Sequence, residues 1–319
     1  MTVALAVRTP RPAVGLAMVL SSGLLYGING TVSKLILRAG LDAPQLTELR
    51  AVGASLGLLA LCLVVRPGPR RLAVPARELP LLAGYGLAGF FLVPMLYYVA
   101  ISRLPVGIAL LFEYTAPLLV ALWARFGQRQ PVKPRLWGGL VVSIVGLAAV
   151  AQVWRSGTGT LDPIGVAAGL GAAVLFALYY LLGARGVARR DALSLNFWAF
   201  AVAAVAGAVV RPLWTFPVGV LSGTSNAVPV WLLVAYLIGC GSVAPYLLVA
   251  AALRHLPPTS VGILGMVEPV VASTVAYLAL GEALTPAQLL GGVLILIGVT
   301  LAETARTPGP GEPGEIPVG

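Results

Sequence analysis

Two carboxylates, Glu113 and Glu268, lie deep inside long apolar stretches of the chain. A charge at the centre of a bilayer costs roughly 3 kcal/mol even on the mildest scales, so such residues usually face a cavity and take part in function. An acid in that position can bind a cationic group or carry a proton. The structural alternative for each glutamate is an internal ion pair, or a protonated acid that joins two helices through a hydrogen bond.

Polar residues also occur in the first and second apolar stretches. Asn29 lies between two glycines, which weaken a helix, and freed backbone groups are tolerated only beside protein or a watery cavity. We therefore expect either a broken helix at which Asn29 offers hydrogen bonds, or a packing kink. Lys34 follows one turn later and either pairs with Glu48 at the membrane interface or extends to the surface. Glu48 and Arg50 begin the second stretch, where we expect structural, interfacial roles.

Tyrosines within the apolar stretches are candidates for the wall of a cavity, with Tyr98 and Tyr179 as the first choices. A place in the membrane core or in an interfacial belt is the alternative for each. Two separated cysteines and a single histidine cannot make an ordinary zinc site. The sequence has no G-x-x-x-x-G-K-[ST] stretch that would bind ATP. We therefore expect neither a metal nor a cofactor.

The composition is that of a membrane protein. Hydrophobic residues make up 59% of the chain and charged residues 10%, with a mean hydropathy of +0.95. A soluble domain is nearer half apolar and a quarter charged. The net charge of +10 would suit nucleic acid, but the basic residues lie in connections and at helix ends. We therefore expect the lipid bilayer, and not nucleic acid, as the partner.

Apolar runs long enough to cross a bilayer, about 20 residues each, recur along the whole chain. Connections rich in proline, glycine and arginine separate them. The pattern predicts an all-α membrane protein with ten transmembrane helices, at about 13–37, 44–65, 79–101, 105–125, 134–153, 162–184, 192–210, 229–253, 258–280 and 285–303.

The two halves of the chain repeat each other. A shift of 152 positions places Leu104-Pro105 on Leu256-Pro257 and Pro117 on Pro269. Five crossings per half make the second copy enter the membrane from the opposite side, which is the inverted repeat of many secondary transporters. We therefore expect five-helix units at 13–153 and 162–303 with a site between them near the midplane. The Pro/Gly-rich cytoplasmic tail at 304–319 is expected to be disordered.

Basic residues orient the predicted helices. Fifteen of the 21 lysines and arginines fall on one side of the ten-helix arrangement, and six fall on the other. The positive-inside rule therefore places both termini in the cytoplasm, in a multi-pass protein of the cytoplasmic membrane. In that orientation Glu113 and Glu268 lie about 12 Å and about 15 Å along their helices, which enter from opposite sides.

These residues together resemble the drug/metabolite transporter superfamily, and in particular its EamA-type members. The likeness extends from about 14 to 303 and is strongest in the second half, through Glu268-Pro269, Gly281-Glu282, Gly291-Gly292 and Gly298. The first helix resembles the family's Trp-Gly-x-Asn stretch with a following lysine, here Tyr26, Gly27, Asn29 and Lys34. Arg50 lies where members often carry arginine. Two features depart from the family: Arg129-Gln130 replaces the first-half Gly-Glu pair, and Glu113 is not a general feature.

The resemblance implies a ten-helix inverted repeat with a central cavity that exports amino acids or other small metabolites, and it gives Glu282 a structural or interfacial place. We expect a secondary active transporter that exports small organic solutes, drug-like compounds included, by alternating access. An ion gradient, with protons as the candidate ion, or exchange would drive it. We favour a monomer.

Three alternatives stay open. An importer or exchanger of metabolites has the same architecture, because direction is not written in an inverted repeat. An integral-membrane enzyme would need a catalytic couple or paired acids at a metal, which the sequence does not display. A membrane scaffold or sensor would be expected to carry a soluble domain.

Overall fold

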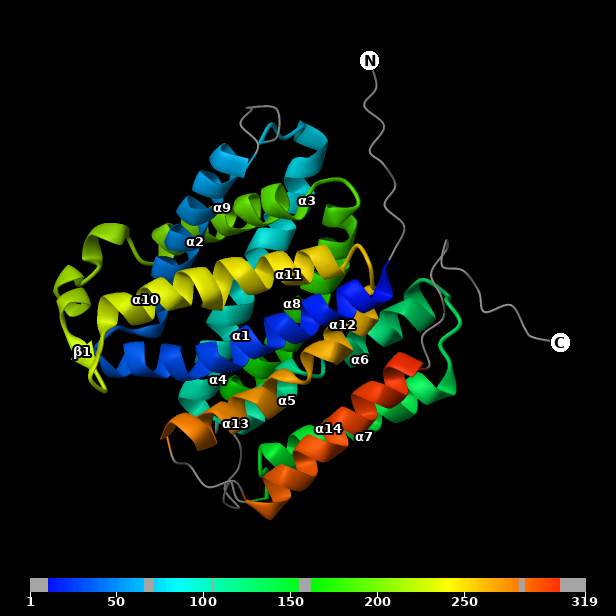
Figure 1. Ribbon diagram of the computed structural model, residues 1–319. Coiled ribbons are helices and arrows are strands. Elements are labelled where there is room, and N and C mark those ends of the chain that lie inside the picture. The colour runs from blue at the N-terminus through cyan, green and yellow to red at the C-terminus, as the bar shows by residue number, and fades with distance from the viewer. Residues whose placement is uncertain (1–10, 66–71, 105, 155–161, 281–284, 305–319) are drawn as a thin grey trace.

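In the computed structural model residues 11–65, 72–104, 106–154, 162–280 and 285–304 are described, and most of them are helical (Figure 1). Within these residues six helices are long and apolar enough to cross a membrane: Pro12–Arg38, Pro44–Val64, Ala76–Tyr97, Pro163–Val187, Ala192–Val210 and Val230–Ala252. Shorter apolar helices accompany them at Pro134–Val150, Pro258–Ala272 and Pro286–Ala302. Helices satisfy their backbone hydrogen bonds internally, as lipid requires. The prediction of a helical membrane protein is confirmed, whereas the tail predicted at 304–319 lies outside the described residues beyond Thr304.

The helices follow the apolar runs of the sequence. The uninterrupted α-helices are α1 (Pro12–Arg38), α2 (Ala43–Val65), α7 (Pro134–Val150), α8 (Pro163–Val187), α9 (Ala192–Val210) and α14 (Pro286–Thr304). Two further runs have a π-helical turn in their middle. The first consists of η2 (Ala76–Glu78), α3 (Leu79–Tyr85), the π-turn η3 (Gly86–Leu92) and α4 (Val93–Arg103). The second consists of α10 (Val230–Ile238), the π-turn η7 (Gly239–Val243) and α11 (Ala244–Ala252). Between α9 and α10 lie the 3-10 turns η5 (Leu213–Thr215) and η6 (Val218–Ser222) and the paired strands β1 (Thr224–Ser225) and β2 (Val228–Pro229).

Two helices that the sequence predicted as continuous, 105–125 and 258–280, are broken, so that part of the prediction was wrong. The first consists of α5 (Val106–Glu113), α6 (Ala116–Leu122) and the π-turn η4 (Trp123–Gly127), and the second of α12 (Pro258–Gly265) and α13 (Glu268–Leu280). Hydrogen bonds that span three residues occur at the breaks, from the Thr115 and Met266 N–H groups to the carbonyls three residues earlier (both 3.0 Å).

Prolines at equivalent places in the two halves explain the breaks. Pro117 lies four residues after Glu113, and Pro269 lies four residues after Gly265. A proline has no N–H for the carbonyl four residues before it, and its ring crowds that carbonyl. Both helices therefore break at the same point of the repeat.

The first helix, in contrast, is continuous where we expected either a break or a packing kink. α1 extends without interruption through Asn29 and both neighbouring glycines. Gly27 provides close packing instead, because a Cβ there would lie 2.6 Å from the Val271 side chain of α13. The Asn29 side-chain oxygen is enclosed beside Gly241, without a hydrogen-bond partner among the residues described. Asn29 therefore does not stand at a broken helix.

α7 and α14 lie side by side at one edge of the bundle (Figure 1). Glycines let the two backbones meet: a Cβ on Gly139 would lie 2.6 Å from the Gly298 carbonyl oxygen, and one on Gly146 would lie 2.7 Å from that of Gly291. The 152-residue shift places Gly139 on Gly291 and Gly146 on Gly298, and so exchanges the two contacts. Small residues allow such close approach of helices in lipid. The contact is thus locally two-fold symmetric.

Gly139→Ala is expected to destabilise the folded protein by about 1–3 kcal/mol, because the new methyl group would overlap the α14 backbone. Gly138→Ala is the matched control, since its Cβ would meet nothing within 4 Å and both changes gain the same helix propensity. Thermal unfolding of the two variants in detergent measures the difference. Equal unfolding midpoints would contradict the close packing of α7 on α14.

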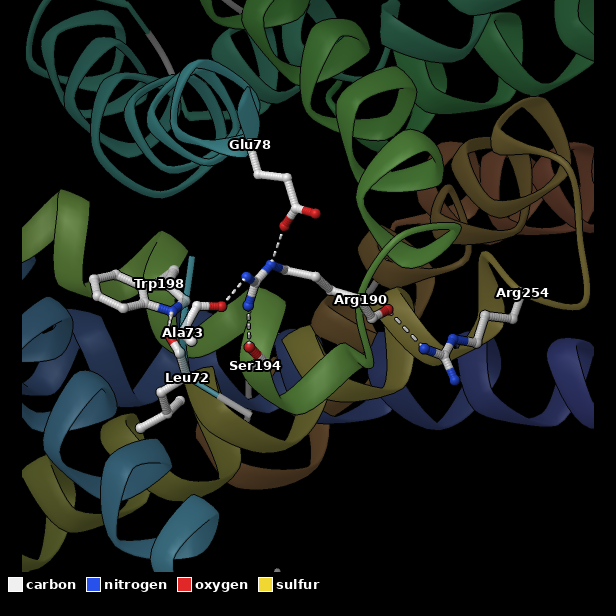
Figure 2. A network of polar contacts seen from close by, with 7 residues as sticks. All are labelled: Leu72, Ala73, Glu78, Arg190, Ser194, Trp198 and Arg254. Atoms are coloured by element: carbon white, nitrogen blue, oxygen red, sulfur yellow. Dashed lines mark hydrogen bonds and ion pairs between the residues drawn. The ribbon is translucent and has the colours of Figure 1, made fainter. Parts of the chain in front are cut away.

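One end of the bundle is held by a network around Arg190, between α8 and α9 (Figure 2). The Arg190 guanidinium pairs with Glu78 (Nε to Oε2, 2.5 Å) and donates to the Ser194 hydroxyl (2.9 Å) and the Ala73 carbonyl. The Arg190 carbonyl accepts a hydrogen bond from Arg254 (2.7 Å). Only 9% of the Arg190 side chain and 12% of the Glu78 side chain are exposed. The segment before α3 is therefore tied to the α8–α9 and α11–α12 connections.

The opposite end carries exposed ion pairs. Arg211 pairs with Asp42 at 2.6 Å and Arg103 with Asp162 at 3.3 Å, and each of the four side chains is more than a third exposed. Asp162 also caps α8 by accepting from the Gly165 N–H (2.8 Å), and this hydrogen bond, with Arg103 nearby, lowers the pKa of its carboxyl group. Exposed ion pairs contribute little to stability. The two ends of the bundle are thus held by contacts of different strength.

Candidate functional site

The two helix breaks bring the acidic side chains together. Glu113 is the last residue of α5, and Glu268 is the first residue of α13. The Tyr114 hydroxyl donates a hydrogen bond to the Glu268 carboxylate, and Glu268 lies close enough to Glu113 for the two charges to interact. Both acidic side chains lie deep within the bundle, yet they are only half-buried. The structure therefore brings two half-buried acids close together inside the bundle.

Tyrosines from two other helices surround the acids. Tyr180 of α8 lies beside the contact between the broken helices, where a Cβ on Gly262 would be 3.2 Å from Pro117 and 3.4 Å from the Tyr180 ring. Tyr26 of α1 is half-buried and near Glu268. Its ring meets that of Tyr246 edge to face, with centroids 5.7 Å apart at 87°.

A buried cation lies near Tyr246. Arg50 of α2 is 8% exposed, and its guanidinium carbon is 5.9 Å from the centre of the Tyr246 ring, within the range of a cation–π interaction. Arg50 Nη2 donates to the Phe90 carbonyl (3.4 Å). Pro94 lies four residues after Phe90 and has no N–H to offer that carbonyl. Arg50, for which a structural, interfacial role was expected, therefore lies inside the bundle near Glu113, and its interfacial depth stays a prediction.

Glu48, for which an interfacial role was also expected, is enclosed among the helices as well, and its interfacial depth stays a prediction. It is 5% exposed, and its carboxyl group lies where a side chain on Gly207 of α9 would be. Neither carboxyl oxygen meets a hydrogen-bond partner within the described part of the chain. The side chain of Lys34 and the whole of Glu282 lie outside the described residues, so the proposed pairing of Lys34 with Glu48 stays a prediction.

Of the two tyrosines predicted to line a cavity, the structure describes the side chain of Tyr179 but not that of Tyr98. Tyr179 is 2% exposed and stacks on Tyr85, with centroids 5.3 Å apart and planes at 7°. Phe176 and Phe90 flank the same ring at 5.7 and 5.8 Å. In this conformation Tyr179 therefore belongs to an aromatic core. The side chain of Tyr98, on α4, lies outside the described residues.

Sequence reasoning missed two members of the central group. Tyr114 was not considered, although it directly follows Glu113 and sits within the Glu-x-x-x-Pro spacing that marks the break. Arg50 was expected to have a structural, interfacial role, and nothing local in the sequence indicates its contacts with Phe90 and Tyr246. The assembled site offers two carboxylates, one guanidinium and several aromatic faces, which together suit a small polar molecule that carries charge.

Comparison with known proteins identifies a family and several relatives. The sequence profile of the EamA-like transporter family matches residues 13–152 and 163–304. The threonine/homoserine exporter RhtA of Escherichia coli (strain K12) is 34% identical over 270 residues, which cover 83% of each chain. An uncharacterized transporter of Archaeoglobus fulgidus is 29% identical over 90% of this chain and 94% of its own. A solved crystal structure shares the fold with a TM-score of 0.74 and 22% identity, over 92% of this chain and 98% of that chain.

Proposed function

We propose that this chain, which belongs to the EamA-like transporter family, exports small polar amino acids as a secondary active transporter. Its membership makes it a membrane-embedded solute transporter rather than an enzyme. The observation that carries the proposal is the meeting of Glu113 and Glu268 at two helix breaks inside the bundle. Discontinuous helices hold the solute and ion sites of many secondary transporters. The RhtA relatives, named as threonine/homoserine exporters, support an amino-acid cargo.

The proposed architecture is a ten-helix inverted repeat with units at 13–153 and 162–303. The family profile matches one segment in each unit, at 13–152 and 163–304. The breaks before Pro117 and Pro269 are related by the same shift that exchanges the glycine contacts between α7 and α14. Both kinds of symmetry support a two-fold relation between the units, with the acids close to their boundary.

The proposed location is the cytoplasmic membrane, with both termini in the cytoplasm. The end of the bundle that carries the Arg190 network also carries several arginines at its helix ends, namely Arg77, Arg185, Arg189 and Arg254. Positive charge concentrates on the cytoplasmic side of membrane proteins. The Arg190 network then lies at the cytoplasmic end, and the Asp42 and Asp162 ion pairs lie at the outer end.

The two glutamates are proposed to bind the ammonium group of the cargo in exchange for a proton. Two neighbouring carboxyl groups disfavour each other's ionised form, and a nearby cation favours it. Arrival of an ammonium group therefore promotes release of a proton, and departure of the cargo promotes its return. With cargo leaving the cell, protons would move inward, so export is driven by the proton gradient.

Alternating access requires that each end of the bundle opens in turn. The buried pair of Arg190 and Glu78 joins connections that must separate for cargo to enter from the cytoplasm. The outer end, held by exposed pairs, has weaker contacts to release. The Arg190 network is thus the proposed cytoplasmic gate.

Glu78→Ala is expected to raise the alkylation rate of a cysteine placed at Val267, beside the break, by at least about tenfold. Loss of one partner of a buried ion pair costs several kcal/mol, and 1.4 kcal/mol corresponds to a factor of ten. The assay applies an impermeant maleimide from the cytoplasmic side to chains whose two native cysteines are serines. Arg211→Gln, which removes an ion pair at the opposite end, should not change the rate. An unchanged rate in Glu78→Ala would exclude the gate.

Efflux from proteoliposomes tests the proposed function. Vesicles that contain the full-length chain and labelled threonine or homoserine should lose label faster than protein-free vesicles, and an inward proton gradient should accelerate the loss. If neither amino acids nor organic cations moved under any gradient, transport would be contradicted and the scaffold or sensor alternative favoured. Flux that required amino acid on the other side of the membrane, and ignored the proton gradient, would identify an exchanger.

A further inference from the structure

Glu48 is a buried acid that the proposed transport mechanism does not use. It is 5% exposed at the contact of α2 with α9, and its carboxyl group occupies the space that a side chain on Gly207 would fill. Neither carboxyl oxygen has a hydrogen-bond partner within the described part of the chain. No charge interaction joins Glu48 to Glu113 or Glu268. Glu48 therefore forms a site of its own, apart from the two central acids.

On α2 and α9 no ionisable side chain pairs with Glu48. Arg50 lies two positions further along α2, and residues at that spacing do not face each other on a helix. α9, which packs along this part of α2, has no ionisable residue between Ala192 and Val210. Arg211 directly follows α9, and it pairs with Asp42 at 2.6 Å.

The other elements packed against α2 carry ionisable groups as well. These are Tyr26, Lys34 and Arg38 of α1, Tyr97, Tyr98 and Arg103 of α4, and Tyr236 and Cys240 of the run α10–η7. The side chains of Lys34 and Tyr98 lie outside the described residues, and none of the others hydrogen-bonds to Glu48. An ion pair with Lys34 is therefore the alternative to an acid that stands alone.

A protonated carboxyl group suits this place better than a charged one. Burial of a carboxylate without a partner is so costly that such a group takes up a proton instead. Mg²⁺ or Ca²⁺ would need about six oxygen ligands, and the described residues contain no group of three or more His, Cys, Asp or Glu that could hold a metal ion. The neutral acid, in contrast, fits beside Gly207 without any separation of the two helices.

We propose that Glu48 is a proton-binding site distinct from the central acids, and that the bound proton holds α2 against α9. Loss of the proton leaves a buried negative charge at the contact, which water can solvate only if the two helices part. The exposed pair of Asp42 and Arg211 joins the same two helices nearby, and such a pair resists their separation only weakly. Proton release at Glu48 is thus coupled to opening at this end of the bundle. The inference does not depend on the proposed function.

Glu48→Gln is expected to make the stability of the fold less sensitive to pH. Glutamine is neutral at every pH, whereas a free glutamic acid ionises above about pH 4.3. An acid that is protonated only in the folded chain makes the wild type lose stability as the pH rises. The unfolding midpoint of Glu48→Gln, relative to wild type, should therefore be about 5 °C higher at about pH 7 than at about pH 5. Asp42→Asn, which changes an exposed and paired acid, should show no such increase.

Reaction with dicyclohexylcarbodiimide, which modifies protonated carboxyl groups in apolar surroundings, tests the wild-type chain directly. At about pH 7, peptide mapping by mass spectrometry should find Glu48 modified in the folded protein but not after denaturation, because the unfolded acid is ionised. Asp42, exposed and paired with Arg211, should stay unmodified in both. Replacement of choline chloride by sodium chloride at equal concentration should change nothing.

Three results would overturn the inference. A folded wild-type chain in which Glu48 reacts only near about pH 4, or not at all, would contain an ionised acid, as an ion pair with Lys34 requires. This result would hold even if Glu48→Gln failed to fold. A midpoint difference that does not change with pH would have the same meaning. Protection of Glu48 by sodium would identify a metal cation in place of the proton. All three are independent of transport, so they leave the proposed function untouched.

Discussion

Replacing Glu268 by glutamine is expected to lower amino-acid efflux by at least about a hundredfold. The amide keeps the size of the side chain and still accepts a hydrogen bond from Tyr114. It has no charge for an ammonium group and no proton to exchange. Loss of one partner of a buried charge pair costs about 2–5 kcal/mol, and each 1.4 kcal/mol is a factor of ten in binding. Initial efflux rates from proteoliposomes, with and without a proton gradient, measure the loss.

Asp42→Asn is the matched control for this change. It replaces an acid by its amide in a side chain that is 42% exposed and paired with Arg211. Exposed pairs contribute little, so efflux should stay within about twofold of the wild-type rate. Glu113→Gln should also be impaired, and the double variant should be no worse than the weaker single variant if both acids serve one site. A Glu268→Gln chain that still exports at the wild-type rate under a proton gradient would refute the assigned role.

The sequence was sufficient to predict where the apolar helices of the chain lie and that two acids lie within them. Hydropathy reports length and apolarity, and the observed helices begin and end within a few residues of the predicted runs. Hydropathy does not show whether a run forms one unbroken helix. In lipid a proline or glycine interrupts a helix only where neighbouring groups satisfy the backbone that it frees. The helices break before Pro117 and Pro269, whereas α1 stays continuous at Asn29, where Gly27 packs against Val271 of α13.

The placement of Arg50 and Glu48 illustrates what the sequence alone does not contain. Charged residues near the start of an apolar run are normally assigned to the interface, because burial without partners is costly. The Arg50 side chain contacts the Phe90 carbonyl, 40 positions away, and the Tyr246 ring on α11. The Glu48 carboxyl group fits against α9 because residue 207 is a glycine. These contacts depend on the packing of distant helices, so local pattern cannot reveal them.

Pro269→Ala is expected to lower efflux by about a hundredfold while leaving the protein as stable as the wild type, or more so. Pro269 is in the first turn of α13, where proline is tolerated, but one continuous helix through α12 and α13 would place this position in its interior. There alanine is favoured over proline by about 3 kcal/mol and supplies the missing N–H. This gain in helix propensity favours one continuous helix in place of α12 and α13. The rearrangement would move Glu268 away from Tyr114 and Glu113. Efflux rates and thermal unfolding midpoints, measured on the same preparation, test the two parts of the prediction.

Pro163→Ala separates the effect of the break from that of losing a proline. Pro163 occupies the first turn of α8, where a helix has no use for the missing N–H, so efflux and stability should both stay near wild type. Pro117→Ala closes the equivalent break and should reproduce the loss seen with Pro269→Ala. Full export by a Pro269→Ala chain with a raised unfolding midpoint would show that the break is dispensable. A loss of export without a loss of stability would instead mean that the interrupted helices are kept for the site they form, at the expense of the stability that continuous helices would add.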